Sequence, residues 1–450
     1  MKKQSIRYLS LCGLLGYGYS LSSLTNALQE DLDFVGVDAG STDPGPYYLG
    51  SGKGFVKRLQ VKRDLELILP EIKKRNIPLI IGSAGGSGAA PHVQSVLDII
   101  SEIAKEKSLE FKTIIIYSDL SKEFLHQAAQ GHIFPCGGAP EFVPGDVDSL
   151  SNPVAQFGTD PIIEALAKNP DVIVAGRCCD TAVFASYPIA HGFDPGLALH
   201  AAKIAECGAL CARPVGANDS LVVEIGDGFF TVEPPNEARV CSPESVAAHS
   251  LYEQPDPNCF YEPEGKIDLS ACTFEQIAPR KVKVTGSKLI PADKATTKLE
   301  GAKRIGFRAL TIAGLRDPAA IAHLDEIESN VRQSVAESAN FIKEGEYTLR
   351  FLRYGVDAVI GKNEPAVTLP NEVGLVIEAI APTQEKADAL IGLARSKALH
   401  QSFPGRKATA GNLAFPFSPS DFSGGEVYEF ALYHLTDLPL SFNVEEMVIK

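Results

Sequence analysis

The stretch Ile80-Ile81-Gly82-Ser83-Ala84-Gly85-Gly86-Ser87-Gly88-Ala89-Ala90-Pro91-His92 decides the fold of this chain. An apolar run from Ile77 to Ile81 leads into it, and apolar residues at helical spacing follow from Val93 to Ile103. This order predicts a strand, a glycine-rich turn and a helix, with Pro91 in the first helical turn. Backbone N–H groups of such a turn can approach a ligand closely, and the helix N-terminus adds partial positive charge. We therefore predict an anion site at Gly82, Ser83, Ala84, Gly85 and Gly86. The alternative is an ordinary turn between strand and helix.

The glycine turn does not match the common nucleotide-binding motifs. No frame places glycines at the first, third and sixth positions of a dinucleotide fingerprint. The turn ends Gly-Ala-Ala, whereas a P-loop ends Gly-Lys-Ser/Thr. A second glycine cluster, Gly13-Leu-Leu-Gly16-Tyr-Gly18, fails both tests because Leu21 stands where the last glycine is needed. These mismatches disfavour NAD and ATP and direct the prediction towards carboxylates.

Apolar runs and helical patterns alternate through the first part of the chain. Predicted helices lie at 24–29, 65–75, 93–106 and 162–168, and Pro70 indicates a kink or a late start in the second. This alternation predicts an α/β fold with a doubly wound, mainly parallel sheet. Ligands of such sheets bind beyond the carboxyl ends of the strands, where Asp38, Asp119 and Arg177 stand. The predicted strands are Ile6–Cys12, Asp33–Val37, Ile77–Ile81, Thr113–Tyr117 and Asp171–Ala175.

Two domains are expected. Residues 1–295 form the α/β domain, with a helix at 197–210 and an excursion at 219–295. In that excursion Gly226-Asp227-Gly228 joins two strand-like runs as a hairpin, 255–263 reads as a surface segment, and 280–285 as a short strand. Residues 301–450 read as strands at 304–312, 347–354, 373–380 and 426–435, with helices at 318–339 and 384–402. That βαββαβ order predicts a smaller α+β, ferredoxin-like domain.

The amino-acid composition disfavours some classes of binding partner and indicates the cellular compartment. The chain has 450 residues, 45% of them hydrophobic, and a net charge of -14, which disfavours nucleic acid and anionic membranes as partners. Its nine cysteines include no C-x-x-C pair, so we expect reduced thiols in a cytoplasmic protein. The N-terminal run Leu9 to Leu15 follows basic residues as in a signal peptide. Glycines interrupt it, so a strand, turn and helix fit better.

An ordered set of motifs resembles the acyclic terpene utilisation family. The motifs are Gly82-Ser-Ala-Gly-Gly86, Gly176-Arg177-Cys-Cys-Asp180-Thr181-Ala182, Glu206-Cys207-Gly208, Gly411-Asn-Leu-Ala-Phe-Pro416 and Tyr433-His434. The resemblance implies catabolic proteins linked to branched or acyclic carboxylic acids and their CoA esters. Some members carry an additional domain or act beside a small partner protein. Where relatives read His-x-x-Glu-Cys-Gly this chain has Lys203, and His200 lies one helical turn earlier on the same face.

Three residues are predicted to be catalytic. Arg177 suits a bidentate clamp on a carboxylate, with a structural ion pair as the alternative. Asp180 is a candidate general base, although an Asp there commonly caps the following helix. His92 at the start of a helix could exchange protons with a ligand, or could simply pack locally.

Other candidates complete the expected site. Asp38 and Asp119 are predicted to bind substrate, and together with Asp43, Glu206 and His200 they could build a divalent-metal site. Cys178 or Cys179 could act as a nucleophile, but buried cysteines beside strands usually pack. Arg406, Asp421 and His434 could close the cleft, or hold the interface between the domains.

We therefore expect an enzyme acting on a small or branched carboxylic acid, free or as its CoA thioester. A hydro-lyase or hydratase is favoured, because removing water next to a carbonyl needs a base and donors for enolate-like charge. An isomerase or racemase at the same site is one alternative. Another is a non-catalytic ligand-binding subunit that needs a small partner protein. We also expect a homo-oligomer.

Overall fold

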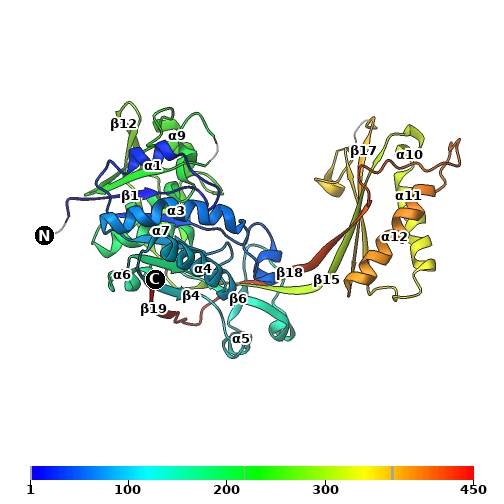
Figure 1. Cartoon of the computed structure of the whole chain (residues 1–450), viewed down its shortest axis with the longest axis horizontal. Helices are drawn as coiled ribbons and strands as arrows, with labels where there is room; N and C mark the ends of the chain where they lie inside the picture. The colour runs from blue at the N-terminus through cyan, green and yellow to red at the C-terminus, as the bar shows by residue number, and fades with distance from the viewer. Residues whose placement is uncertain (1–2, 217, 366–368) are drawn as a thin grey trace. The chain divides into compact units, whose positions relative to one another are not determined.

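The computed structural model describes residues 3–216, 218–365 and 369–450 (Figure 1). The chain divides into two compact units, Met1–Lys303 with Phe430–Lys450, and Arg304–Glu429. The last strand, β19 (Asn443–Ile449), belongs to the first unit because it pairs antiparallel with β4 (Phe111–Tyr117). The C-terminal segment therefore returns to the first unit after the chain has formed the second. In the described part of the chain, no helix has the length and apolar character needed to cross a membrane.

A ten-stranded mixed sheet forms the framework of the first unit. At its centre, the five strands expected from the apolar runs pair in parallel, in the order β1-β2-β3-β7-β4. Their runs of apolar, mostly β-branched residues are buried on both faces, as parallel strands require. The bounds are β1 (Ser5–Ser10), β2 (Phe34–Asp38), β3 (Leu79–Gly82) and β7 (Val172–Ala175).

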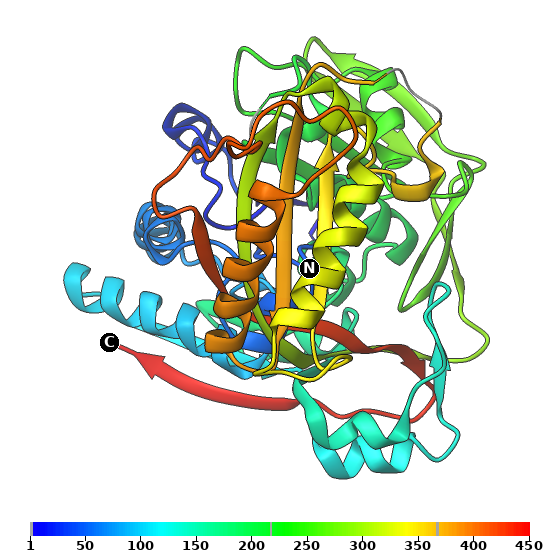
Figure 2. The ribbon, with the colours of Figure 1, turned by 90° about the vertical axis from the view of Figure 1, so that its right-hand side faces the viewer.

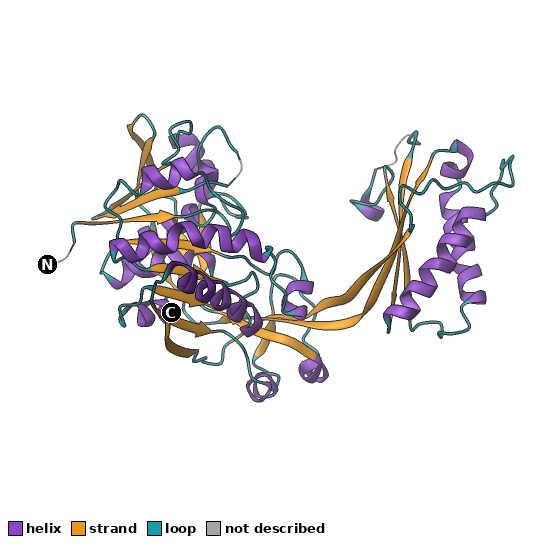
Figure 3. Ribbon diagram, viewed as in Figure 1, coloured by secondary structure: helices purple, strands orange, loops and turns teal. Residues whose placement is uncertain are grey.

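Side chains that alternate along these strands pack into two hydrophobic cores, one on each face of the sheet. Tyr8, Phe34 and Ile80 pack into one core with helices α6, α7 and α8, whereas Leu9, Val35 and Ile81 pack into the other with α1, α3 and α4. Helices therefore cover both faces of the sheet (Figure 3). The bounds are α1 (Leu21–Ala27), α3 (Arg58–Arg75), α4 (Ala90–Lys107), α6 (Asp160–Leu166), α7 (Asp180–Ala190) and α8 (Pro195–Ala205).

Two predicted helix boundaries need correction. Helix α3 begins at Arg58, not late, and Pro70 lies inside it, because Val61 already belongs to the buried stripe that continues to Ile72. Helix α8 ends at Ala205 instead of residue 210. Gly208 there adopts a left-handed φ of 58°, and a short 3-10 turn, η2 (Gly208–Cys211), follows.

The segment 219–295 extends the sheet and adds a smaller one. The expected hairpin is present as β8 and β9, and β8 pairs with β1. The expected surface segment 255–263 is wrong in part, because β10 buries Phe260 and turns Glu262 inward. The bounds are β8 (Leu221–Gly226), β9 (Phe229–Glu233), α9 (Pro243–Ser250), β10 (Cys259–Glu262), β11 (Gly265–Asp268), β12 (Thr273–Ala278), β13 (Lys281–Thr285) and β14 (Lys288–Pro291).

Between β4 and β7 the chain adds α5 and β6, and another short helix, α2, follows β2. Strand β6 pairs antiparallel with the start of β15, so residues 298–303 are held against a strand of the first unit. The bounds are α2 (Pro46–Ser51), α5 (Lys122–Ala128), β5 (Ile133–Pro135), η1 (Pro144–Ser149) and β6 (Leu150–Gln156).

The second unit has its own sheet and core. Its strands lie in the order β16-β17-β15-β18, with β17 antiparallel to both β15 and β16. Helices α11 and α12 lie side by side on one face of this sheet (Figure 2). The bounds are β15 (Thr297–Leu315), α10 (Pro318–Ala322), α11 (Leu324–Ser338), β16 (Thr348–Tyr354), η3 (Gly361–Asn363), β17 (Val373–Ala381), α12 (Gln384–His400) and β18 (Asp421–Thr436).

Candidate functional site

Charged side chains from distant segments meet at the carboxyl ends of β2, β3 and β7. Asp38 ends β2, and Arg177 and Asp180 follow β7. Helix α8 and the residue that follows it add Lys203 and Glu206, β10 adds Glu262, and β15 adds Glu300. We call Asp38, Asp180, Glu206, Glu262 and Glu300 the carboxyl cluster. Its place agrees with the rule that open α/β sheets bind ligands beyond their strand ends.

The glycine turn forms one wall of the cluster. Ser83, Gly85, Gly86 and Gly88 all have positive φ angles. The amides of Ala84, Gly86 and Gly88 donate to carbonyls of the chain at 2.9–3.2 Å, which holds the turn in shape. The amides of Ser83, Gly85 and Ser87 have no acceptor among the described residues. These three amides, rather than those of the whole turn, keep an unused hydrogen-bond donor.

Gly88 brings the turn against the next strand. A Cβ at this position would lie 2.2 Å from the backbone nitrogen of Arg177. The Ser118 hydroxyl joins the same two segments, because it donates to the Gly88 carbonyl at 3.1 Å and accepts from the Arg177 amide at 2.7 Å. Close packing of the turn and β7 therefore depends on glycine here.

Arg177 is buried, at 3% exposure, and is engaged by the chain itself. Its Nε donates to Glu300 Oε2 at 2.8 Å, and its Nη1 donates to Ser83 Oγ at 3.2 Å and to the Cys178 carbonyl at 3.1 Å. Burial alone would raise the pKa of Glu300, but Arg177 and Lys298 lower it to about 2. The guanidinium thus makes the structural ion pair that the sequence left open as the alternative to a substrate clamp.

Asp180 and Asp38 each carry an enclosed carboxyl oxygen, Oδ1, that accepts no hydrogen bond from the described atoms. Asp180 is the first residue of α7 and makes no capping bond; its Oδ1 lies 3.6 Å from Arg177 Nη1. Asp38 accepts from the Gly40 amide at 3.0 Å with Oδ2, whereas Oδ1 has no partner among the described atoms. Burial raises the pKa of both groups, and the charge of Asp180 raises that of Asp38 further. Carboxyl groups in this state are suited to proton transfer.

Glu206 faces Asp180 from the end of α8. Burial, and then the charge of Asp180, raise the pKa of Glu206 to about 8, although Lys203 at 2.6 Å acts in the opposite direction. Burial lowers the pKa of Lys203, but Glu206 outweighs it, so the pKa is raised and the ammonium stays charged. Lys203 therefore supplies a cation beside Glu206.

Glu262 is a member of the site that the sequence did not indicate. It accepts from Thr181 Oγ1 at 2.7 Å and from Cys179 Sγ at 2.8 Å, and burial raises its pKa to about 7. The alternation of buried Phe260, exposed Tyr261 and inward Glu262 is the strand signal that could have found it. Burial also raises the pKa of the Cys178 and Cys179 thiols, which disfavours them as nucleophiles.

Several other predicted residues lie apart from the cluster. The Nε2 atom of His92 contacts the Tyr48 and Lys53 carbonyls at 3.0 and 3.2 Å, and burial lowers its pKa. Asp119 accepts from the Ala90 amide at 3.0 Å, so it caps α4. His200 is buried with both ring nitrogens on serine hydroxyls, those of Ser287 and Ser250.

The metal site considered from the sequence does not assemble. Asp43 is exposed, and Asp119 and His200 are engaged as just described. Among the residues that the structure describes, no three His, Cys, Asp or Glu side chains are grouped so that they could hold a metal ion.

The three C-terminal candidates have local partners. Arg406 donates to five backbone carbonyls between residues 400 and 410, and Asp421 pairs with Arg395 at 2.8 Å. His434 lies 2.9 Å from the Pro140 carbonyl through Nε2. Each of these side chains is held by neighbours of its own unit.

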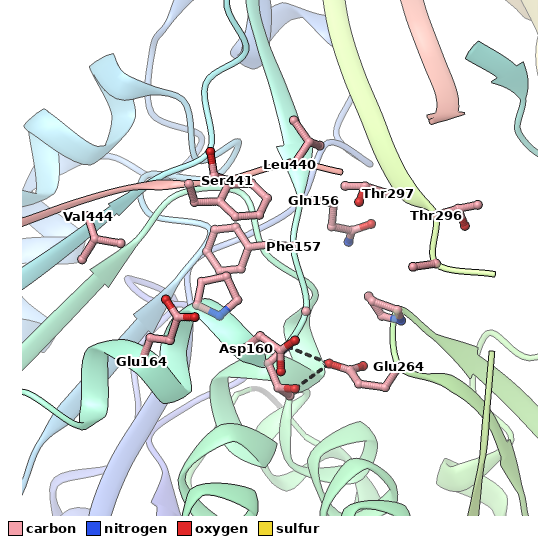
Figure 4. A pocket seen from close by; sticks show the side chains of 16 residues that line it. Gln156, Phe157, Asp160, Glu164, Glu264, Thr296, Thr297, Leu440, Ser441 and Val444 are labelled. Atoms are coloured by element: carbon pink, nitrogen blue, oxygen red, sulfur yellow. Dashed lines mark hydrogen bonds between the residues drawn. The ribbon is translucent and has the colours of Figure 1, made fainter. Parts of the chain in front are cut away.

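A cavity of about 460 Å³ lies beside the cluster, against the loop that continues from Glu262 to Glu264 (Figure 4). Glu264 accepts from the amide and the hydroxyl of Thr159, both at 2.7 Å. Phe157 and Phe442 line it with ring centroids 4.9 Å apart, and Asp160 and Glu164 add carboxylates. None of the residues lining it is Lys, Arg or His. A cavity with this charge disfavours an anionic ligand.

A comparison with known protein families covers most of the segments that build this site. The model described as acyclic terpene utilisation family protein AtuA matches residues 49–418. The chain belongs to the acyclic terpene utilisation family. The family match includes the glycine turn, the segment from Arg177 to Asp180 and Glu206. Membership relates the protein to the utilisation of acyclic terpenes. No curated protein and no solved structure matches the chain.

Proposed function

We propose that this family member is a catabolic enzyme for a small or branched carboxylic acid, free or as a CoA thioester. The favoured reaction is that of a hydro-lyase or hydratase. One observation carries the proposal: Asp38 and Asp180 each have an enclosed oxygen that accepts no hydrogen bond, and they lie in the same cluster as Glu206, whose pKa is raised to about 8. Groups with such perturbed pKa values at strand ends are typical of acid–base sites.

The roles follow from the charge on each group. Burial raises the pKa of Asp180, whereas the charges of Arg177 and Lys203 favour its ionised form, and in that form it takes the proton from the carbon next to the carbonyl. Protonated Glu206 donates to the departing hydroxyl, which leaves as water. The free amides of the glycine turn, at Ser83, Gly85 and Ser87, stabilise the enolate-like oxygen. Arg177 orients Asp180, and Glu300 holds Arg177.

The test is turnover by purified protein with hydroxy acids, their unsaturated partners and the CoA thioesters of both. We expect Asp180→Asn to lower kcat at least about 100-fold, the usual contribution of a general base. Asp227→Asn, at the exposed tip of the β8–β9 hairpin, is the matched control and should turn over like the native protein. Turnover by Asp180→Asn equal to that of the control would remove Asp180 from the mechanism.

The same assay separates the other functions. Proton exchange without net gain or loss of water would identify an isomerase or racemase. Tight binding of a ligand with no chemistry, together with a co-purifying small protein, would identify a binding subunit. We propose a homo-oligomer as the working state, to be checked by light scattering.

We also propose finer descriptions of the two folds. Helices on both faces of the parallel strands support a doubly wound sheet in the first unit. The strand order β16-β17-β15-β18, with helices before β16 and before β18, supports a ferredoxin-like second unit.

A further inference from the structure

An unusually basic segment follows the first strands of a chain that is otherwise acidic. Residues 53–63, Lys-Gly-Phe-Val-Lys-Arg-Leu-Gln-Val-Lys-Arg, contain five basic side chains and no acidic one, whereas the whole chain has a net charge of -14. Lys53, Lys57, Arg58 and Arg63 are exposed. Arg58 pairs with Glu102, and Arg63 pairs with Asp64, but Lys53 and Lys57 present their charge on the surface.

Aromatic rings run alongside these charges. Lys53 Nζ donates to the Tyr47 hydroxyl at 3.2 Å, and the Tyr47 and Tyr48 rings lie 5.4 Å apart. The Tyr48 ring contacts Phe55 at 5.1 Å, and Phe55 contacts Tyr17 at 6.3 Å between centroids. Tyr17 is 48% exposed. We call Tyr17, Tyr47, Lys53, Phe55, Lys57 and Arg63 the basic–aromatic surface.

This surface adjoins the candidate site. The Phe55 amide donates to the Gly85 carbonyl at 3.1 Å, and the Lys53 carbonyl contacts His92 Nε2 at 3.2 Å. The same glycine turn packs against Arg177 through Gly88. A single turn therefore separates the basic–aromatic surface from the carboxyl cluster. Buried His92 has a structural role in this arrangement, because its contact with the Lys53 carbonyl holds the segment that carries Lys53.

We propose that the basic–aromatic surface binds the phosphorylated adenosine end of a CoA thioester, whose acyl group reaches the carboxyl cluster. Adenine stacks on aromatic rings such as that of Tyr17, and phosphates pair with lysine and arginine. A free carboxylic acid has no group that would use such a surface. The inference rests on the proposed function, and within it selects the thioester over the free acid.

Calorimetric titration of the full chain with CoA and with pantetheine tests this. Pantetheine lacks the nucleotide, so we expect it to bind at least tenfold more weakly than CoA. The double variant Lys53→Glu, Lys57→Glu should lose at least tenfold in affinity for CoA, with pantetheine unaffected. Lys105→Glu, Lys107→Glu, at the exposed end of α4, makes the same change in net charge and should bind CoA like the native protein.

Equal affinity for CoA and pantetheine, or native CoA affinity in the Lys53→Glu, Lys57→Glu variant, would overturn the inference. Preference for vesicles of anionic lipid or for an oligonucleotide over CoA would overturn it too, because either would identify a different polyanion. Binding does not require turnover, so the two proposals can fail separately. CoA binding without any reaction contradicts the proposal that the protein is an enzyme. Turnover of free acids by a protein that does not bind CoA contradicts only the proposal that the basic–aromatic surface binds CoA.

Discussion

Removing the charge of Glu300 should destabilise the first unit strongly while leaving its shape nearly unchanged. Glu300 is fully buried and pairs with buried Arg177 at 2.8 Å and with Lys298 at 2.9 Å. In Glu300→Gln the new amide can still accept from Thr42 Oγ1, which lies 2.9 Å from Oε1. The variant therefore removes mainly the charge that compensates two cations.

The magnitude follows from the pKa and from the behaviour of buried pairs. The pKa of Glu300 falls from 4.5 to about 2 on folding, because Arg177 and Lys298 outweigh the effect of burial. A shift of that size corresponds to roughly 3 kcal/mol. Breaking a buried pair by removing one partner costs about 3–5 kcal/mol. For a unit of this size we expect a fall in Tm of about 4–8 °C.

The assay is scanning calorimetry of the native protein, Glu300→Gln and the control Glu110→Gln. Glu110 pairs with Lys450 at 3.1 Å, but both side chains are more than half exposed, so its loss should cost well under about 1 kcal/mol. Because the folded pKa of Glu300 is depressed, its contribution is present above pH 4.5 and is lost as pH falls towards 2. Equal Tm values for the Glu300 and Glu110 variants at pH 7 would refute the reasoning.

Three further predictions concern pH and packing. If Glu206 is the general acid, kcat should fall as pH rises above about 8, where Glu206 loses its proton, and a pH–rate profile of Glu206→Gln should lack that limb. Burial lowers the pKa of His200 from 6.5 to about 3. The contribution of neutral His200 to the free energy of unfolding is therefore complete above pH 6.5 and is lost as pH falls towards 3. In His200→Gln, urea unfolding between pH 6 and 4.5 should show a slope smaller by up to about 1.4 kcal/mol per pH unit. Gly88→Ala should lower Tm far more than Gly228→Ala. Both glycines have positive φ, but a Cβ at 88 meets the Arg177 backbone, whereas one at 228 meets open space.

Local sequence patterns predicted the framework of the first unit well. The apolar runs that end at Val37, Ile81 and Ala175 are strands whose parallel pairing brings Asp38, the glycine turn and Arg177 to one edge. The strand–turn–helix order around Gly82–His92 is also confirmed. These features depend on residues close in sequence, so periodicity and turn chemistry determine them.

The rest of the site depends on contacts between distant residues. Glu300 comes from a strand 123 positions after Arg177, which it reaches through pairing of β15 with β6. Glu262 lies in a segment whose prolines and acids resemble a surface loop. No local pattern indicates that such residues converge. For the same reason Asp119, which follows a strand as Asp38 does, proved to cap α4 instead of joining the cluster.

Solvent-deuterium exchange into substrate tests the central claim most directly. The protein is incubated in D₂O with a hydroxyacyl-CoA and the corresponding free acid, and deuterium next to the carbonyl is followed by mass spectrometry. The account predicts exchange at that carbon with the native protein and with Asp227→Asn, and at least a 100-fold slower exchange with Asp180→Asn. Exchange that persists unchanged in Asp180→Asn, or no exchange with either class of substrate, would contradict proton transfer at the carboxyl cluster.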